Sequence, residues 1–105
     1  MPLVTVFTPT YNRAYCLHRV LESLKSQTFQ NFEWLIIDDG STDNTKSWVE
    51  QNRSNCEFSI RYFYQENKGK HIAINKGVKE AKGEFIIIAD SDDTFKPETI
   101  EVFLE

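Results

Sequence analysis

An acidic cluster directly follows an apolar run late in the chain. Residues 84–89 read Glu-Phe-Ile-Ile-Ile-Ala, and the next four are Asp90-Ser91-Asp92-Asp93. The Ile-rich run has the length of a strand, and we expect it to be a central strand buried on both faces of a parallel sheet. Carboxylates crowded at the end of such a strand repel one another unless a cation lies among them. Mg²⁺ and Mn²⁺ prefer oxygen ligands, so the cluster indicates a metal-assisted site for a phosphate-bearing ligand.

Two further polar segments follow predicted strands. Residues 9–13 come after the β-branched run at 3–8, and Asp38-Asp39-Gly40 comes after a strand predicted over 32–37. Ser41-Thr42-Asp43-Asn44 is typical of the start of a helix, because these side chains accept hydrogen bonds from free backbone N–H groups. We expect Asp38 to hold backbone N–H groups of the turn that follows it.

The elements that position these segments alternate along the chain. Apolar spacing predicts an amphipathic helix from Ala14 to about Gln27, a strand over 58–64 and a helix after Lys70 with Ile74, Val78 and Ala81 on its inward face. Gly83 is expected to close that helix as a C-cap, and Pro97 to begin a last helix. Trp34 and Trp48 are predicted to be core residues.

Strand–helix alternation predicts a three-layer α/β sandwich with a mostly parallel sheet and right-handed crossovers. The expected strand order is 3-2-1-4. Because ligands bind at the carboxyl ends of strands in open α/β sheets, three polar segments should converge on one cleft. They are Pro9–Arg13, Asp38–Asp39 and Asp90–Asp93.

Composition limits the class of protein. The chain has 105 residues, 40% hydrophobic and 13% aromatic, which indicates one folded domain. A net charge of −4 argues against a nucleic-acid partner, which needs a basic face. The two cysteines, Cys16 and Cys56, form no metal-binding motif and are expected to be reduced. No apolar run is long enough to cross a bilayer and no signal peptide is evident, so we expect a cytoplasmic protein, with any association with the cytosolic face of a membrane made by regions outside this sequence.

Three motifs in order resemble a known family. They are Val6-Phe7-Thr8-Pro9-Thr10-Tyr11-Asn12-Arg13, then Leu35-Ile36-Ile37-Asp38-Asp39-Gly40-Ser41-Thr42-Asp43, and then Ala81-Lys82-Gly83-Glu84-Phe85-Ile86 leading into Asp90-Ser91-Asp92-Asp93. Together they cover nearly the whole chain and resemble the family-2 glycosyltransferases. The resemblance implies the Rossmann-like GT-A fold, a nucleotide-sugar donor that is most often a UDP-sugar, and Mn²⁺ or Mg²⁺ as the cofactor.

The resemblance also implies which residues bind the donor. They are Pro9, Tyr11, Asn12, Arg13, Asp39, Lys70, Asp90, Ser91 and Asp92. Asp39 would accept a hydrogen bond from the ring N–H of the base. Pro9 and Tyr11 would flank the base and the ribose.

The remaining implied roles concern the ribose, the diphosphate and the metal. Asp90 would lie near the ribose, Lys70 would reach the phosphates, and Gly69 fits a close approach of the loop to the ligand. Asp92 would coordinate the metal, with Asp93 as a second, supporting metal residue.

The resemblance further implies inversion at the anomeric carbon by a carboxylate base. That base is expected beyond residue 105, so residues 1–105 would be the donor-binding part of a longer domain and inactive alone. The acceptor would be a saccharide or a lipid-linked molecule, as in polysaccharide and cell-envelope synthesis. A homodimer formed through the apolar face that the missing half would cover is left open.

Other interpretations are weaker or remain open. Asp90-Ser91-Asp92-Asp93-Thr94 also fits the nucleophile motif of haloacid-dehalogenase-like phosphatases, with Asp90 as nucleophile and Asp92 as general acid–base, but that reading leaves Pro9–Asn12 and Asp38–Asp39 unexplained. A calcium loop fails because Phe95 stands where its glycine belongs. A non-catalytic module that binds a nucleotide sugar remains the open alternative.

Overall fold

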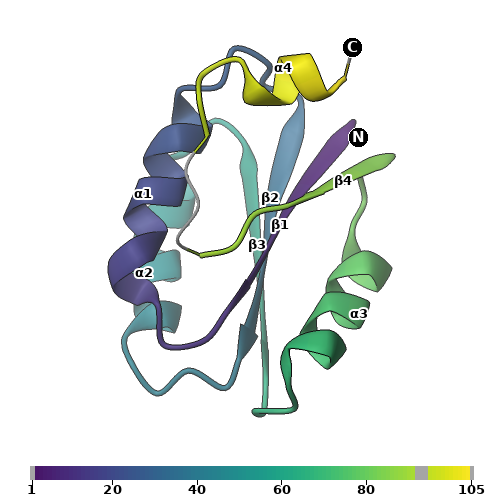
Figure 1. Ribbon diagram of the computed structural model, residues 1–105. Coiled ribbons are helices and arrows are strands. Elements are labelled where there is room, and N and C mark those ends of the chain that lie inside the picture. The colour runs from purple at the N-terminus through teal and green to yellow at the C-terminus, as the bar shows by residue number, and fades with distance from the viewer. Residues whose placement is uncertain (1, 92–94, 105) are drawn as a thin grey trace.

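The computed structural model describes residues 2–91 and 95–104 and has the predicted α/β architecture (Figure 1). Four parallel strands form one sheet in the order β3-β2-β1-β4, which confirms the predicted order 3-2-1-4. The strands are β1 (Val4–Thr10), β2 (Phe32–Asp39), β3 (Ser59–Gln65) and β4 (Phe85–Ile88). β1 and β2 each end two residues further along the chain than predicted, at Thr10 instead of residue 8 and at Asp39 instead of residue 37.

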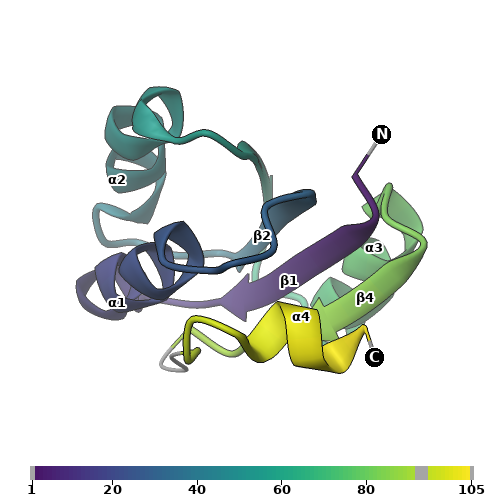
Figure 2. The ribbon, with the colours of Figure 1, turned by 90° about the horizontal axis from the view of Figure 1, so that it is seen from above.

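Helices cover both faces of this sheet. They are α1 (Ala14–Lys25), α2 (Thr45–Asn52), the short 3-10 helix η1 (Arg53–Asn55), α3 (Lys70–Glu80) and α4 (Thr99–Phe103). Seen from above, α1 and α2 lie on one face and α3 on the other, so the three layers are confirmed (Figure 2). α4 lies beside the end of α1, where the backbone N–H of Ile100 donates to Oε1 of Gln27 at 3.1 Å.

The two central strands, β1 and β2, are buried along their whole length. On the face under α1 and α2, Trp34 is fully buried and its indole N–H donates to Oγ1 of Thr8 at 2.9 Å. Its ring meets that of Trp48 edge to face, with the ring centres 6.3 Å apart. Both tryptophans are therefore core residues, as predicted.

The face under α3 holds a smaller apolar cluster, built around Phe7. The buried positions of α3 are Ala73 and Gly77, whereas Val78 is 53% exposed. The predicted inward face is thus wrong at Val78, because α3 meets the sheet with the side that carries Ala73 and Gly77. A Cβ on Gly77 would lie 2.3 Å from the Phe7 ring.

Gly83 does not cap α3, contrary to prediction. The helix ends at Glu80, and the next residue, Ala81, has an extended backbone conformation. The N–H of Gly83 instead donates to Oγ1 of Thr5 at 2.9 Å, and a Cβ at this position would lie 2.5 Å from the Thr5 nitrogen. Glycine is therefore needed here for close contact between this turn and β1.

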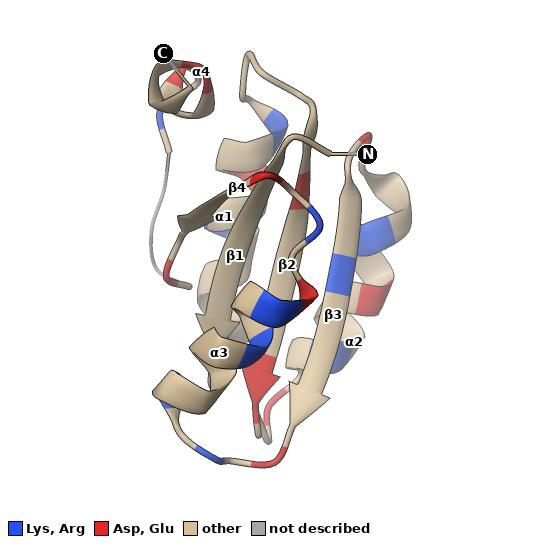
Figure 3. Cartoon of the chain, turned by 90° about the vertical axis from the view of Figure 1, so that its right-hand side faces the viewer, with Lys and Arg blue, Asp and Glu red and all other residues tan. Residues whose placement is uncertain are grey.

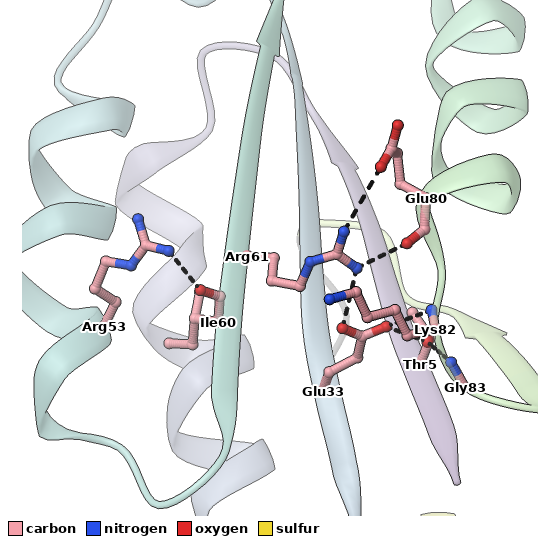
Figure 4. A network of polar contacts seen from close by, with 8 residues as sticks. All are labelled: Thr5, Glu33, Arg53, Ile60, Arg61, Glu80, Lys82 and Gly83. Carbon is pink, nitrogen blue, oxygen red and sulfur yellow. Dashed lines mark hydrogen bonds and ion pairs between the residues drawn. The ribbon is translucent and has the colours of Figure 1, made fainter. Parts of the chain in front are cut away.

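A buried carboxylate joins the same turn to the sheet (Figure 4). Glu33, only 2% exposed, accepts hydrogen bonds from the Thr5 hydroxyl (2.6 Å), the Lys82 N–H (2.8 Å) and the Arg61 guanidinium (3.2 Å). Arg61 also donates to the carbonyl oxygen of Glu80 at 2.7 Å. This network fixes the end of α3 at the edge of the sheet where the strands begin.

β4 differs from the strand expected for the Ile-rich run. Phe85 is 47% exposed and Ile88 is 50% exposed, so this strand is not buried on both faces. The reason is topological, because β4 is the outermost strand and pairs only with β1 in the described part of the chain. The ring of Phe103 in α4 meets Phe85 edge to face, with the centres 6.5 Å apart.

Cys16 and Cys56 are both free, as predicted. Within residues 2–91 and 95–104, the helices are all too short or too polar to cross a membrane.

Candidate functional site

A pocket of about 370 Å³ opens at the edge of the sheet where the strands end. Its lining residues are Pro9, Thr10, Tyr11, Arg13, Asp39, Lys70, Ala73, Asp90 and Ser91. The structure thus brings together residues from each of the three polar segments that the sequence placed at this edge, and it adds the start of α3. Figure 3 shows the acidic end of β2 beside the helix α3, which carries several basic residues.

Strand register explains why Asp90 and Ser91 reach this pocket. Phe7 of β1 pairs with Ile88, the last residue of β4, and the Ala89 N–H donates to the Phe7 carbonyl oxygen at 2.8 Å. The chain then leaves the sheet beside the last residues of β1. Asp90 and Ser91 therefore follow at the level of Pro9 and Thr10.

The loop between β1 and α1 contributes an aromatic and a cationic side chain. Tyr11, which is 46% exposed, and Arg13, two positions further along the chain, both line the pocket. A guanidinium N–H of Arg13 donates to the hydroxyl of Tyr15 at 3.2 Å. Asn12, predicted to bind the donor, does not line the pocket and instead bonds to residues 41–43.

Asp39 is the buried carboxylate of the pocket, at 8% exposed. One oxygen accepts hydrogen bonds from the Gln65 amide (2.9 Å) and the Lys68 N–H (2.8 Å), and the other from the Gly69 N–H (3.1 Å). Burial raises the pKa of this carboxyl, but the three hydrogen bonds outweigh it and hold the pKa below its usual value. Asp39 is therefore ionised at neutral pH and can only accept further hydrogen bonds.

The start of α3 supplies a second cation to the pocket, Lys70. Nζ of Lys70 lies 3.4 Å from Oδ1 of Asp90, with both side chains substantially exposed. Gly69 precedes the helix at φ +105°, a left-handed conformation that favours glycine. This turn directs the backbone N–H groups of Lys68 and Gly69 at Asp39.

Two lining residues, Thr10 and Ala73, were not among the residues predicted to bind the donor, although Thr10 lies within the segment Pro9–Arg13 that was expected at the cleft. Thr10 is 4% exposed, and its hydroxyl has no hydrogen-bond partner among the residues that the structure describes. Its position at the end of β1, between two predicted residues, was the available signal. That Ala73 lines the pocket could be predicted only if the side of α3 that faces the sheet were known.

Supporting residues brace the turn after β2. Asp38, 1% exposed, accepts hydrogen bonds from the Ser41 N–H (2.9 Å) and the Tyr62 hydroxyl (2.5 Å), which confirms its predicted structural role. Burial and the Asp38 carboxylate both raise the pKa of Tyr62. Asp43 accepts from the Ala14 N–H at 3.2 Å and so caps α1 from a different segment of the chain.

The predicted metal residues Asp92 and Asp93 lie outside the described residues. In the part that is described, no three His, Cys, Asp or Glu side chains are grouped closely enough to hold a metal ion. Asp90, two positions before Asp92 in the sequence, places one carboxylate at the pocket. Oxygen ligands of this kind fit Mg²⁺ or Mn²⁺ rather than a soft metal.

Comparisons with known proteins agree on one family. The model of glycosyl transferase family 2 matches residues 5–105. The GalNAc(5)-diNAcBac-PP-undecaprenol beta-1,3-glucosyltransferase of Campylobacter jejuni is 38% identical over 95 residues, which cover 89% of this chain and 30% of that protein. The chain spans between 17% and 41% of the length of the curated relatives that it matches.

Solved structures share the fold. S. aureus TarS in complex with UDP-GlcNAc has a TM-score of 0.84 and 33% identity, over 99% of this chain and 30% of that one. A mannosyltransferase from Pyrobaculum calidifontis, in complex with GDP-Man and Mn²⁺, has a TM-score of 0.83 and 31% identity, over 90% of this chain and 28% of that one. The family match, the fold and the order of the three motifs lead to one conclusion: this chain belongs to glycosyl transferase family 2 and has the GT-A fold.

Proposed function

We propose that residues 1–105 are the donor-binding portion of a metal-dependent, inverting glycosyltransferase that uses a UDP-sugar. The observation that carries the proposal is the convergence of Tyr11, Asp39, Lys70 and Asp90 on one pocket at the carboxyl edge of the sheet. The pocket offers an aromatic ring, a buried hydrogen-bond acceptor and a cation, the three features that a nucleoside diphosphate needs. The UDP-GlcNAc complex of TarS, a similar structure, supports this donor class.

In this proposal the nucleoside lies between Pro9, Tyr11 and Asp39. The buried Asp39 carboxylate accepts the ring N–H of uracil, and Gln65 and the turn at 68–69 hold it in place. A charged acceptor fixed in a low-dielectric site discriminates strongly against a base that presents no donor there. Pro9 and Tyr11 supply apolar and aromatic surface on either side.

The diphosphate is assigned to the cationic part of the pocket. Arg13 and Lys70 both line it, and Lys70 is paired with Asp90 through side chains that are 66% and 49% exposed. An exposed pair of this kind is weak, so the ammonium can turn to the phosphates at little energetic cost. Asp90, which lines the same pocket, is assigned to a ribose hydroxyl.

Asp92 and Asp93 are proposed to hold Mn²⁺ or Mg²⁺. A divalent cation bound there would neutralise charge that develops on the leaving diphosphate. The complex of the P. calidifontis mannosyltransferase with Mn²⁺ supports a divalent metal.

The acceptor and the catalytic base are assigned to the remainder of a longer protein. The relatives that match this chain are at least about twice as long, which leaves room for an acceptor-binding half. The name of the C. jejuni relative supports a lipid-linked saccharide as acceptor. The proposed reaction transfers the sugar to an acceptor hydroxyl with inversion.

Calorimetric titration with UDP, with and without Mn²⁺, tests the proposal. Wild-type chain is expected to bind UDP more tightly with Mn²⁺, and Asp92→Ala to lose the metal-dependent part of the affinity. Glu98→Ala, which removes an exposed carboxylate nearby in the sequence, is the matched control and should bind like wild type. A folded wild-type chain that binds no UDP under either condition contradicts the proposal.

A further inference from the structure

Asn12 stands between two pocket residues without lining the pocket itself. Tyr11 and Arg13 both line it. Asn12 has φ +51°, the left-handed region, and among the described residues it is the only one other than glycine with a positive φ. A conformation of this kind at a functional loop is worth explaining, because most side chains adopt it only at an energetic cost.

The side chain of Asn12 connects the loop after β1 to the loop after β2. Its Oδ1 accepts hydrogen bonds from the backbone N–H groups of Thr42 (2.7 Å) and Asp43 (3.2 Å). Its own backbone N–H donates to Oγ of Ser41 at 2.8 Å. The Thr42 hydroxyl also donates to Oδ1, at 3.5 Å, so four hydrogen bonds at one residue join segments about thirty positions apart.

Residues 41–43, to which Asn12 is hydrogen-bonded, are themselves held in place by other hydrogen bonds. The Asp38 carboxylate accepts the Ser41 N–H at 2.9 Å, and the Asp43 carboxylate accepts the Ala14 N–H at 3.2 Å. Both carboxylates therefore hold the 41–43 segment against regular elements of the fold. Asn12 therefore connects the loop that carries Tyr11 and Arg13 to residues 41–43, which have a fixed position in the fold.

Position 12 requires a left-handed backbone and a side chain that accepts two N–H groups, and few residue types combine the two. The left-handed backbone favours Gly, Asn and Asp, and a short side-chain oxygen that accepts two N–H groups is available only from Asn or Asp in that set. Glycine would keep the backbone conformation and lose the acceptor. Aspartate would keep both, at the cost of an added charge.

We propose that Asn12 is a positioning residue of the donor pocket, which sets the places of Tyr11 and Arg13 by bonding to residues 41–43. This inference rests on the proposed donor site. Without these hydrogen bonds, Tyr11 and Arg13 would sample positions away from the nucleotide. Nucleotide binding would then carry the entropic cost of ordering both side chains. The nucleotide then binds more weakly although no group that touches it has changed.

The test compares Asn12→Gly with Asn12→Asp in this chain. For Asn12→Gly we expect faster hydrogen exchange at the Thr42 and Asp43 amides and an affinity for UDP about tenfold lower. Asn12→Asp should keep the slow exchange and recover most of the affinity, measured at physiological salt to screen its charge. Asn55→Gly, an exposed position at the opposite edge of the sheet, is the matched control and should leave both measurements unchanged.

Ser41→Ala is a milder second variant in case Asn12→Gly does not fold. It removes only the acceptor of the Asn12 N–H and should weaken UDP binding by about threefold. An unchanged UDP affinity in a folded Asn12→Gly chain, or in Ser41→Ala if Asn12→Gly does not fold, overturns the proposal. So does an Asn12→Asp variant that keeps slow exchange and yet binds as weakly as Asn12→Gly, because the amide would then contact the donor itself.

Failure of the proposed function gives a different result. In that case the wild-type chain binds no UDP, and amide exchange alone decides whether Asn12 holds the two loops together. Slow exchange that persists in Asn12→Gly then overturns the attachment, and faster exchange supports it.

Discussion

Lys70 and Asp90 join α3 to the segment after β4 at the pocket, with 3.4 Å between Nζ and Oδ1. The two residues are 20 positions apart, and neither is buried. Exposed ion pairs contribute little to stability, so the pair does not account for the fold. Because both side chains line the pocket, the position of the pair is consistent with a role in binding a ligand.

Replacing Lys70 should therefore separate binding from stability. We expect Lys70→Ala to lower the affinity for UDP by about tenfold, the loss of one charge-assisted hydrogen bond, and to change the free energy of unfolding by less than about 1 kcal/mol. Calorimetry and urea unfolding measure the two quantities. Lys79→Ala, at the other end of the same helix, is the control, and equal losses of affinity in both variants would argue against the assignment.

Asp39 should determine which nucleobase the pocket prefers. Its lowered pKa keeps the carboxyl ionised above its ordinary value of 3.8, so it accepts and cannot donate. Uracil presents an N–H to such a group and cytosine presents a lone pair at the same position. We expect CDP to bind at least about tenfold more weakly than UDP from pH 5 to pH 8. Equal affinities in a competition titration would show that Asp39 does not contact the base.

Most of the fold could be predicted because its signals are local. Pro9 ends one apolar run and Asp38 another, and alternation of strands with helices restricts the sheet to few topologies. The exposure of Phe85 could not be read from its neighbours, because an Ile-rich run looks the same in a central strand and at an edge. The strand order decides which it is, and the predicted order 3-2-1-4 already put this strand at the edge, in conflict with the expected burial on both faces.

The candidate site was predicted less completely, for a similar reason. Tyr11, Asp39 and Asp90 follow strands and could be placed at one edge of the sheet by topology alone. Whether a loop residue lines the pocket or braces it depends on side-chain direction, so Asn12 could not be distinguished from Tyr11. Gly77 and Gly83 are likewise explained only by contacts with β1, which sequence spacing does not reveal.

Thr10 gives a prediction about stability. Its buried hydroxyl lacks a partner in the described structure, whereas the equally buried hydroxyl of Thr8 accepts the Trp34 indole N–H. We expect Thr10→Val to stabilise the chain by about 1 kcal/mol, and Thr8→Val to destabilise it by about 1–3 kcal/mol because the indole loses its partner. Chemical unfolding of the two variants, on the same strand, measures the difference. Destabilisation by Thr10→Val would mean that its hydroxyl is hydrogen-bonded in solution.

Glu33 gives a prediction about pH. Burial raises its pKa, but the hydrogen bonds from Thr5, Lys82 and Arg61 bring the pKa below its ordinary value of 4.5. The folded state thus favours the ionised form, whose stabilising effect is complete at neutral pH and is lost as the pH falls below about 4.5 and through the folded-state pKa. We expect Glu33→Gln to lower the free energy of unfolding by about 2 kcal/mol at pH 7 and by much less at pH 3.

Unfolding curves of both proteins at a series of pH values measure this difference. The other carboxyls with a lowered pKa, Asp39 and Asp43, are present in both chains, so their contributions cancel. A difference that stays constant from pH 7 to pH 3 would show that the ionised form of Glu33 is not what stabilises the network.

The most direct measurement is a crystal structure of this chain with UDP and Mn²⁺. The account predicts the uracil between Pro9 and Tyr11, its N–H on the Asp39 carboxylate, and the diphosphate near Lys70. UDP bound at another edge of the sheet, or a uracil N–H directed away from Asp39, would contradict it.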